Sequence, residues 1–337
     1  MMIELLPEKG HFFKTNMHCH TNISDGKCTP QQVKEIYKKN GYSAVCFTDH
    51  EVLIDHRDLC DPDFVALHGY EVAVKKSLEE HTGWFMPVYH FNMISKHQDN
   101  LVVPRYFVEN PFFPGNAREW SKTHAQYAER METTVYDIDW INDYLKSIKD
   151  GGFLINYNHP QWSLHNASDY LGLEHLHSIE VINGACRDMN DNTSIHYEQL
   201  LRAGKRIVPT GGDDMHHPGH VMQAWTMIKA EELTYEALIS AYERGNCYAS
   251  EGPEIRSLII EDGRIVVKTS PAAGIFLYSE GRYIDCVTSK TETYTEARFD
   301  YCPEKMGRFF RIEVKDTAGN KAFSNAYYTA EIAEETK

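Results

Sequence analysis

The segment HCHTNISDG, residues 18–26, brings two histidines and an aspartate close together in the sequence. His18 and His20 are two residues apart, and side chains two apart on a β-strand project from the same face. Their imidazoles can therefore reach one metal ion, and Asp25 offers a carboxylate beside them. The triplet Thr48-Asp49-His50 ends the next apolar run and supplies another histidine. This pattern predicts a metal site and makes the chain a candidate metallohydrolase.

The composition is that of an ordinary globular protein with an excess of acidic residues. The chain has 337 residues, of which 42% are hydrophobic and 25% charged, and its formal net charge is −15 at pH 7. This length allows one large domain or two ordinary ones. The negative charge disfavours long nucleic acid as a partner, because polyphosphate backbones are usually bound by basic surfaces.

Three features of the sequence favour the cytoplasm. Residues 1–14 lack the basic and apolar regions of a signal peptide. No apolar run approaches the length of a membrane span, so we expect no membrane partner. The eight cysteines form no C-x-x-C pair and are typical of reduced thiols. We therefore expect a cytoplasmic protein.

Residues 13–250 alternate short apolar runs with amphipathic segments. We expect strands at 13–20, 44–47, 64–71, 152–157, 178–182 and 206–209, and helices at 30–41, 135–148, 193–203 and 233–244. Repeated strand-then-helix units predict an α/β, barrel-like fold. Residue types that bind metals follow the carboxyl ends of these strands, which is where such barrels carry their active sites.

Two regions depart from this alternation. Residues 78–134 are rich in aromatic side chains and read as an insertion over the barrel mouth, either a lid or a surface subdomain packed on its own aromatics. Residues 251–337 contain short strands and turns with no helices between them, which predicts a small all-β, sandwich-like domain. We expect this domain to begin after residues 1–250 and to have a structural role or to join copies of the chain into a homo-oligomer.

Six short motifs follow one another along the expected strand ends. They are His18-Cys19-His20, Ser24-Asp25-Gly26, Thr48-Asp49-His50, Gly69-Tyr70-Glu71, Asn158-His159-Pro160 and Asp214-Met215-His216. In order and spacing this set resembles the PHP (polymerase and histidinol phosphatase) family of metal-dependent phosphoesterases, over residues 15–217. The resemblance implies a distorted (β/α)7 barrel whose site holds three divalent ions, with Mn, Fe and Zn all compatible with the ligand types.

The resemblance also implies which side chains bind the ions. The first ion would take His18, His20, Glu71 and Asp214. The second would share Glu71 and take His159 and a histidine that follows Glu71, and the third would take Asp25, His50 and His216. For the histidine after Glu71 we expect His90, because residues 88–91 read as a strand, whereas the alternative, His81, lies in a polar turn.

The chemistry implied by the resemblance is hydrolysis of a phosphate ester. A hydroxide that bridges two ions would attack phosphorus while the metals neutralise the other oxygens. Glu71, as the shared carboxylate, would set the spacing of the metals, and His216 or a metal-bound water would protonate the leaving oxygen. Asp49 is expected outside the ligand set, where it would orient His18 or His50, and Asp213 is the less favoured of the two adjacent aspartates.

Some of these residues also have a purely structural interpretation. Taken alone, Asp25 would cap the turn at Gly26, and His159 would hydrogen bond at the end of a strand. Cys19 points away from its two neighbouring histidines and is expected in the barrel core.

Three further side chains are candidates for binding the substrate. Arg187 follows an expected strand and would pair with a phosphate oxygen, although a surface ion pair is the ordinary fate of an arginine. Gln161 and His217 lie next to expected ligands in the sequence, as does Trp162, and would face the same barrel mouth.

Together these observations predict a phosphoesterase acting on a small phosphorylated metabolite. Monoester phosphatase and cyclic phosphodiesterase activities both fit. The alternatives are a nuclease of short oligonucleotides, a carbamate or amide hydrolase, and a metal-binding domain without catalysis. We expect residues 78–134, and not the metal ligands, to select the leaving group.

Overall fold

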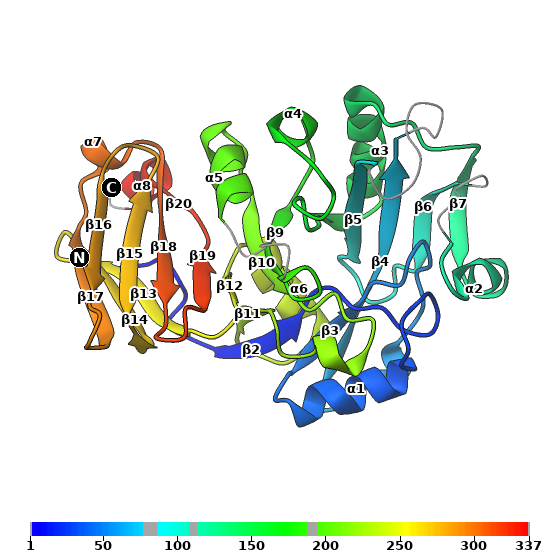
Figure 1. Ribbon diagram of the computed structural model, residues 1–337, viewed down its shortest axis with the longest axis horizontal. Coiled ribbons are helices and arrows are strands. Elements are labelled where there is room, and N and C mark those ends of the chain that lie inside the picture. The colour runs from blue at the N-terminus through cyan, green and yellow to red at the C-terminus, as the bar shows by residue number, and fades with distance from the viewer. Residues whose placement is uncertain (1, 77–85, 108–112, 188–193, 336–337) are drawn as a thin grey trace.

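A computed structural model describes residues 2–76, 86–107, 113–187 and 194–335, and its largest feature is a sheet of fourteen strands (Figure 1). The half of this sheet that carries the motifs runs in the order β10-β9-β8-β5-β4-β3-β2. Its strands are β2 (His11–Asn16), β3 (Ala44–Phe47), β4 (Val65–Lys75), β5 (Val88–Ser95), β8 (Phe153–Tyr157), β9 (Ser178–Asn183) and β10 (Val208–Gly212).

Helices and turns connect these strands as the alternating sequence pattern predicted. They are α1 (Pro30–Lys39), the 3-10 turn Arg57–Leu59, α3 (Ile138–Asp150), α4 (Ala167–Tyr170), α5 (Ile195–Arg202), the 3-10 turn Pro218–His220 and α6 (Tyr235–Glu243). Helix α1 begins with a capping box, in which the Thr29 hydroxyl accepts from the Gln32 backbone and Pro30 occupies the first turn. Helix α3 buries Ile141, Leu145 and Ile148, the spacing that places side chains on one helix face.

Strand β5 makes part of residues 78–134 a component of the central sheet. It pairs antiparallel with β4 on one side and with β8 on the other, and all eight of its residues are buried. The remaining described elements of this segment are β6 (Val102–Phe107), α2 (Ala117–Thr123) and β7 (Gln126–Met131), with β6 and β7 forming a parallel pair of their own. That the segment acts as a lid stays a prediction.

The predicted closed barrel is not confirmed. Strand β11 (Trp225–Ala230) pairs with β2 and with β12 (Cys247–Ser250), but within the described residues no strand ladder joins it to β10. The two strands lie side by side, and Thr226 Oγ1 links them by accepting from Gly211 N and donating to Gly211 O, both at 3.0 Å. Strand β10 is therefore an edge strand of the sheet. In the other direction the sheet continues from β12 into the C-terminal strands.

The C-terminal third extends this sheet and adds a second one. Beyond β12 follow β19 (Lys321–Ser324), β18 (Phe309–Lys315), β15 (Gly274–Ser279) and β16 (Ile284–Thr288), with β20 (Tyr327–Tyr328) paired to β18. The second sheet contains β1 (Met2–Glu4), β13 (Ile255–Glu261), β14 (Arg264–Ala272) and β17 (Tyr294–Asp300). Apolar side chains from both sheets share one core, as in a sandwich.

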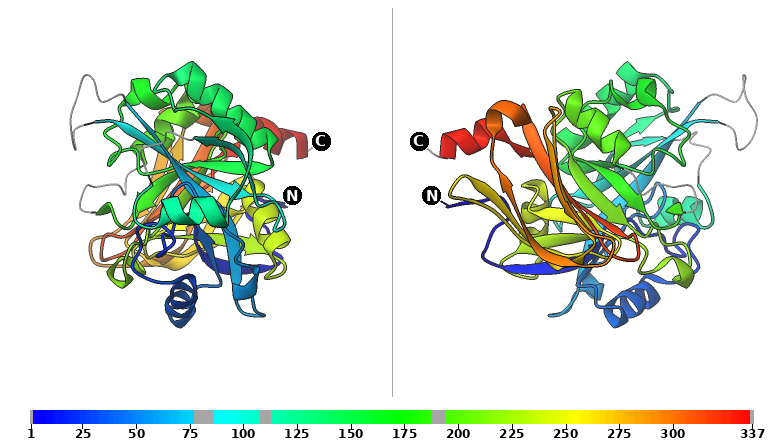
Figure 2. Two further views of the ribbon diagram at one scale, coloured as in Figure 1. Left: turned by 90° about the vertical axis from the view of Figure 1, so that its right-hand side faces the viewer. Right: turned by 60° about the vertical axis from the view of Figure 1, so that its left-hand side comes forward.

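The structure of this region differs in two details from what the sequence predicted. The short helices α7 (Pro303–Met306) and α8 (Thr329–Glu335) lie where only strands and turns were expected. Strand β1 pairs antiparallel with β13, so the start of the chain completes a sheet of its C-terminal third. In Figure 2 the C-terminal strands stand beside the central sheet as its continuation. No helix in the described part of the chain is long and apolar enough to span a membrane.

Candidate metal centre

The expected metal ligands converge from six strands and the segments that follow them. His18 and His20 follow β2, His50 follows β3, Glu71 lies in β4 and His90 in β5, His159 follows β8, and Asp214 and His216 follow β10. The loop after β2 carries Asp25. All are buried except Asp25 and His216, whose side chains are 28% and 31% exposed. The site is therefore open to solvent on the side of these two residues.

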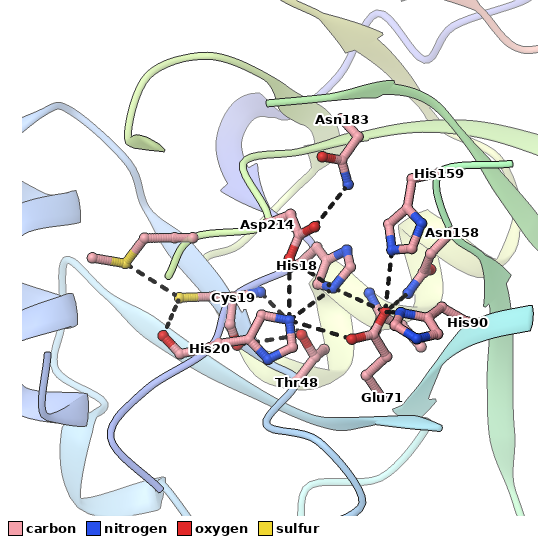
Figure 3. A network of polar contacts seen from close by, with 12 residues as sticks. His18, Cys19, His20, Thr48, Glu71, His90, Asn158, His159, Asn183 and Asp214 are labelled. Carbon is pink, nitrogen blue, oxygen red and sulfur yellow. Dashed lines mark hydrogen bonds and ion pairs between the residues drawn. The ribbon is translucent and has the colours of Figure 1, made fainter. Parts of the chain in front are cut away.

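The Glu71 carboxylate lies at the centre of this cluster (Figure 3). Its Oε1 atom is 3.0 Å from His90 Nδ1, 3.3 Å from His18 Nε2 and 3.5 Å from His159 Nε2. Its Oε2 atom is 3.1 Å from His50 Nδ1 and 3.3 Å from His20 Nε2. One carboxylate thus faces five imidazoles, which is the position expected of a ligand shared between two ions. His81, the alternative to His90, lies outside the described residues.

Asp214 is a second carboxylate with several imidazoles close to it. Its Oδ1 atom lies 3.1 Å from His20 Nε2, 3.3 Å from His18 Nε2 and 3.5 Å from His216 Nδ1. Asp214 has φ 49° and His159 has φ 25°, in the left-handed region that residues other than glycine seldom occupy. Such backbone strain concentrates at functional sites, and here it falls on two expected ligands.

Asp25 closes the solvent side of the cluster. Its oxygens lie 3.7 Å from His50 Nε2, 3.7 Å from His216 Nε2 and 3.8 Å from His20 Nδ1. These separations are too long for hydrogen bonds. They leave a space bounded by three nitrogens and a carboxylate.

The donor atoms form four groups in which every ligand atom is within 4.8 Å of the others. The groups are His20, Asp25, His50 and His216; His18, His159 and Asp214; His18, His20 and Glu71; and Glu71, His90 and His159. The nine residues expected from the sequence are thus all brought together. The number and the identity of the ions stay predictions.

The residues present fit a metal in three respects. The Nε2 atoms of His18 and His20 point at each other across 3.1 Å, a contact that a shared cation would stabilise. His20 Nδ1 is buried and makes no hydrogen bond within the described residues, and the same holds for Asp214 Oδ1. Buried polar atoms are normally paired, so unpaired ones in a cluster of ligand types point to a missing partner. Imidazole and carboxylate together suit Mn, Fe and Zn.

The electrostatics of the cluster agree with a site built for cations. Burial alone would raise the pKa of Glu71, but the imidazoles of His90, His18 and His50 hold it well below its usual value. Burial would lower the pKa of His20, yet its contacts with Asp214 and Glu71 raise it to about 10. The carboxylates therefore keep their negative charge in the interior and attract positive charge toward it.

Two buried polar residues support the ligands and were not identified as functional from the sequence. Asn158 Nδ2 donates to Glu71 Oε1 at 2.7 Å, and Glu180 Oε1 contacts His18 Nδ1 at 2.8 Å. Asn158 lies in the motif Asn158-His159-Pro160, of which the sequence indicated only His159 as a ligand. Glu180 had a visible signal, because a carboxylate in the middle of the buried strand SIEVIN is seldom tolerated without partners.

The two aspartates expected outside the ligand set have different roles from each other. Asp49 accepts from Thr21 N and Oγ1 at 2.8 Å each, and from Ser24 Oγ at 2.7 Å. It therefore holds the loop that carries Asp25, and its expected role in orienting His18 or His50 stays a prediction. Asp213 accepts from Tyr37 and Tyr42 and from the backbone of residues 222–224, away from the cluster.

The Arg187 guanidinium contacts the C-terminal part of the chain. It donates to Gln223 Oε1 and to Asn320 Oδ1, both at 3.0 Å, and lies 3.7 Å from Glu251. These contacts are those of a surface arginine in an ion pair, which was the structural alternative to phosphate binding. Its role in substrate binding stays a prediction.

The other substrate-binding candidates lie on loops beside the ligands. The Trp162 ring is 4.9 Å from the His159 ring and 5.3 Å from the His90 ring, and Gln161 precedes it as an exposed residue. His217 Nδ1 accepts from Gly219 N at 3.1 Å and caps a short 3-10 turn. Cys19 is fully buried with its Sγ 3.7 Å from Met215 Sδ, which places it in the core as expected.

Comparisons with known proteins bear on the N-terminal part of the chain. Residues 16–128, about a third of the sequence, match the family model described as the PHP domain. No curated protein matches the chain. The matched residues include His18, Glu71 and His90.

Three solved structures share weaker likeness. A two-domain protein from Bacteroides vulgatus, described as containing a predicted PHP-like metal-dependent phosphoesterase, is 14% identical, with 97% of each chain covered and a TM-score of 0.40. A proposed metal-dependent phosphoesterase from Bifidobacterium adolescentis is 17% identical, over 64% of this chain and 90% of that one, with a TM-score of 0.36. An amidohydrolase from Chromobacterium violaceum with bound sulfate and no metal is 14% identical, over 61% and 88%, with a TM-score of 0.35. At these TM-scores the likeness carries no functional information.

Proposed function

We propose that this chain, a member of the PHP family through residues 16–128, is a metal-dependent phosphoesterase with three divalent ions. The substrate that we propose is a small phosphorylated metabolite, hydrolysed as a phosphomonoester or as a cyclic phosphodiester. The observation that carries the proposal is the buried Glu71 carboxylate facing five imidazoles, with Asp214 and Asp25 on either side of them.

Divalent ions in this cluster would act as Lewis acids that neutralise phosphoryl oxygens and lower the pKa of water. The protein's contribution is to fix the donor atoms. Glu71 can reach two neighbouring groups at once, one through each oxygen, and would set the spacing between them. Asn158 holds that carboxylate in place through a hydrogen bond to Oε1.

His216 was expected both to bind a metal and to protonate the leaving oxygen. Its Nδ1 atom lies 2.9 Å from the Asp214 backbone carbonyl, which can only accept, so Nδ1 carries the hydrogen. Nε2 then has a lone pair directed toward Asp25. A nitrogen whose lone pair binds a metal cannot donate a proton, so the two roles exclude each other at this atom. We assign His216 to metal binding and leave protonation of the leaving group to water.

The charge of the protein supports a small substrate. The formal net charge of −15 would repel a long polyanion, whereas cations in a half-open cluster would attract a single phosphate group. Trp162 beside His90 and His159 offers a flat surface next to the cluster on which the leaving group of such a substrate could rest. We propose Gln161 and His217 as further contacts at the same mouth.

A substrate panel tests the proposal directly. Protein loaded with Mn, Fe or Zn is assayed on nucleoside monophosphates, sugar phosphates, cyclic phosphates, short oligonucleotides, a carbamate ester and an amide. We expect hydrolysis within the first three classes and loss of at least 100-fold in Glu71→Gln. Glu313→Gln, a buried carboxylate of β18, serves as the matched control and should keep full activity. Activity confined to the carbamate or amide, or equal activity in Glu71→Gln, would overturn the proposal.

A further inference from the structure

Glu180 lies beside the expected metal ligands, at the middle of β9, and is 4% exposed. Its Oε1 atom is 2.8 Å from His18 Nδ1. Its Oε2 atom accepts from the backbone N–H of His159 at 3.0 Å and from Asn183 Nδ2 at 2.9 Å. One side chain thus contacts three of the strand ends that build the site.

These partners determine where the hydrogen of His18 resides. A backbone N–H and a side-chain amide NH₂ can only donate, so Oε2 acts purely as an acceptor. A carboxylate that accepts at both oxygens requires Nδ1 of His18 to carry the ring hydrogen. In the neutral ring that a metal ion requires, the His18 Nε2 atom is then left with its lone pair, and it faces His20 Nε2 at 3.1 Å, Glu71 at 3.3 Å and Asp214 at 3.3 Å.

The contacts of Glu180 also link the members of one donor group. His18, His159 and Asp214 form a group of possible metal ligands, and Glu180 contacts the first two directly. It reaches the third through Asn183, whose Nδ2 atom donates to Asp214 Oδ2 at 3.3 Å as well, as Figure 3 shows. The three ligands come from separate strand ends and have this carboxylate as their common support.

Neighbouring backbone makes room for this arrangement. A Cβ atom at Gly212 would lie 2.8 Å from His18 Cβ and 3.0 Å from Glu180 Oε1, distances that a real side chain would not allow. The absence of a side chain at the end of β10 therefore lets His18 and Glu180 approach each other. The packing of β10 and the position of the Glu180 carboxylate therefore both favour the contact between Glu180 and His18.

We propose that Glu180 is a positioning residue that holds His18 in the Nδ1–H tautomer and locks His18, His159 and Asp214 into one metal-binding geometry. The proposal rests on the proposed function only in that this donor group binds a divalent ion. Glu180 does not touch the ion or the substrate. It acts through its partners, and its negative charge strengthens the imidazole of His18 as a ligand.

Replacing Glu180 with glutamine keeps the size of the side chain. In either orientation of the amide it disrupts the hydrogen bonds with His18, His159 and Asn183. With its oxygen toward His18, the amide NH₂ faces two other donors, His159 N–H and Asn183 Nδ2. With its nitrogen toward His18, it donates to Nδ1 and moves the ring hydrogen to Nε2, the atom that faces the cluster. Either orientation weakens the metal site, because outer-shell partners of ligating histidines typically account for about 10–100-fold in metal affinity.

The test measures Mn²⁺ and Zn²⁺ dissociation constants by calorimetric titration of metal-free protein, with no phosphate substrate present. We expect Glu180→Gln to bind about 10–100-fold more weakly than the wild type. In the Zn²⁺-loaded wild type, the ¹⁵N spectrum of the histidines should show His18 protonated at Nδ1. Glu313→Gln, which removes a buried carboxylate in β18, should bind with the affinity of the wild type.

Asn183→Ala provides a second variant in case Glu180→Gln does not fold. It leaves Glu180 in place and removes the two hydrogen bonds of Asn183 Nδ2, to Glu180 Oε2 and to Asp214 Oδ2, so we expect a loss of about tenfold. Unchanged affinity in the folded Glu180→Gln protein, or in Asn183→Ala, would overturn the inference, as would a hydrogen on Nε2 of His18. A wild type that binds no metal would instead refute the proposed function, so the two failures are distinguishable.

Discussion

Asn158 Nδ2 donates a 2.7 Å hydrogen bond to the same oxygen of Glu71 that faces His18, His90 and His159. That oxygen therefore has a fixed direction before any ion binds. Asn158→Ala should leave the carboxylate free to rotate and lower kcat/KM for a phosphomonoester by about 10–100-fold. Steady-state kinetics at saturating metal will measure this. An unchanged kcat/KM would mean that the histidines alone orient Glu71.

Asp25 supplies the only carboxylate of the donor group on the solvent side. Asp25→Asn should release the ion held there with His50 and His216 and reduce the metal content by one ion per chain, while the buried groups around Glu71 stay loaded. Elemental analysis after gel filtration gives the stoichiometry, with Asp63→Asn, an exposed aspartate of the same chain region, as control. Equal metal content in the two variants would count against a third ion.

Gly212 is the point where β10 touches both His18 and Glu180. Gly212→Ala introduces a methyl group 2.8 Å from His18 Cβ, so we expect overpacking to cost about 1–3 kcal/mol of unfolding free energy and to weaken metal binding. Gly263→Ala is the control, because its Cβ would meet open space at φ +75°. It should cost about 1–2 kcal/mol through backbone strain and leave metal affinity unchanged. Urea unfolding and metal titration on both variants separate the two effects.

His56 gives a prediction about pH that does not involve the metal cluster. Its pKa is lowered to about 3, mainly by burial and also by the nearby His68, while Asp55 partly opposes this shift. In the unfolded chain the same group titrates near 6.5, so the unfolded state takes up the proton first as the pH falls. The stability that neutral His56 contributes is complete above pH 6.5 and is lost as the pH falls toward 3, by about 1.4 kcal/mol per unit.

The measurement is urea unfolding of metal-free protein at pH 7 and pH 5. Between these values His56→Gln should lose about 2 kcal/mol less than the wild type. Identical losses in the two proteins would show that His56 titrates normally in the folded state.

Arg187 has two interpretations that a double-mutant cycle separates. If its main role is the contact with Asn320, then Arg187→Ala and Asn320→Ala should be coupled by about 1 kcal/mol in unfolding free energy. If instead it binds phosphate, Arg187→Ala should raise KM at least tenfold with no coupling to Asn320. Thermal unfolding and steady-state kinetics on the four proteins of the cycle distinguish the two cases.

The sequence predicted the local parts of the site well because each depends on a few neighbouring residues. The period of a strand predicted that His18 and His20 face the same way, and their rings do meet although β2 ends at Asn16, before both residues. Asp214 and His216 follow an apolar run that ends in glycines. His90 was placed by recognising residues 88–91 as a strand, even though the surrounding segment was read as an insertion. The structure shows why that strand is needed, since β5 fills the sheet between β4 and β8.

What the sequence did not show depends on contacts between distant residues. Glu180 is one charged residue in a buried strand, and its partners His18 and His159 are far from it in the chain. The absence of a ladder between β10 and β11 in the described part of the chain is likewise a matter of long-range packing, since Thr226 Oγ1 makes both hydrogen bonds to the Gly211 backbone there. Neither local propensity nor motif spacing contains this information, because both are set by how the strands pack.

The pairing of β1 with β13 has a consequence for how the protein is made. Residues 2–4 are synthesised long before their partner strand, residues 255–261. Strand β1 therefore cannot form this ladder until β13 has been made, and the second sheet of the C-terminal third is complete only when both strands are present. Synthesis that stalls before β13 would leave β1 without its partner strand and would expose the side chain of Ile3, which is buried in the folded protein.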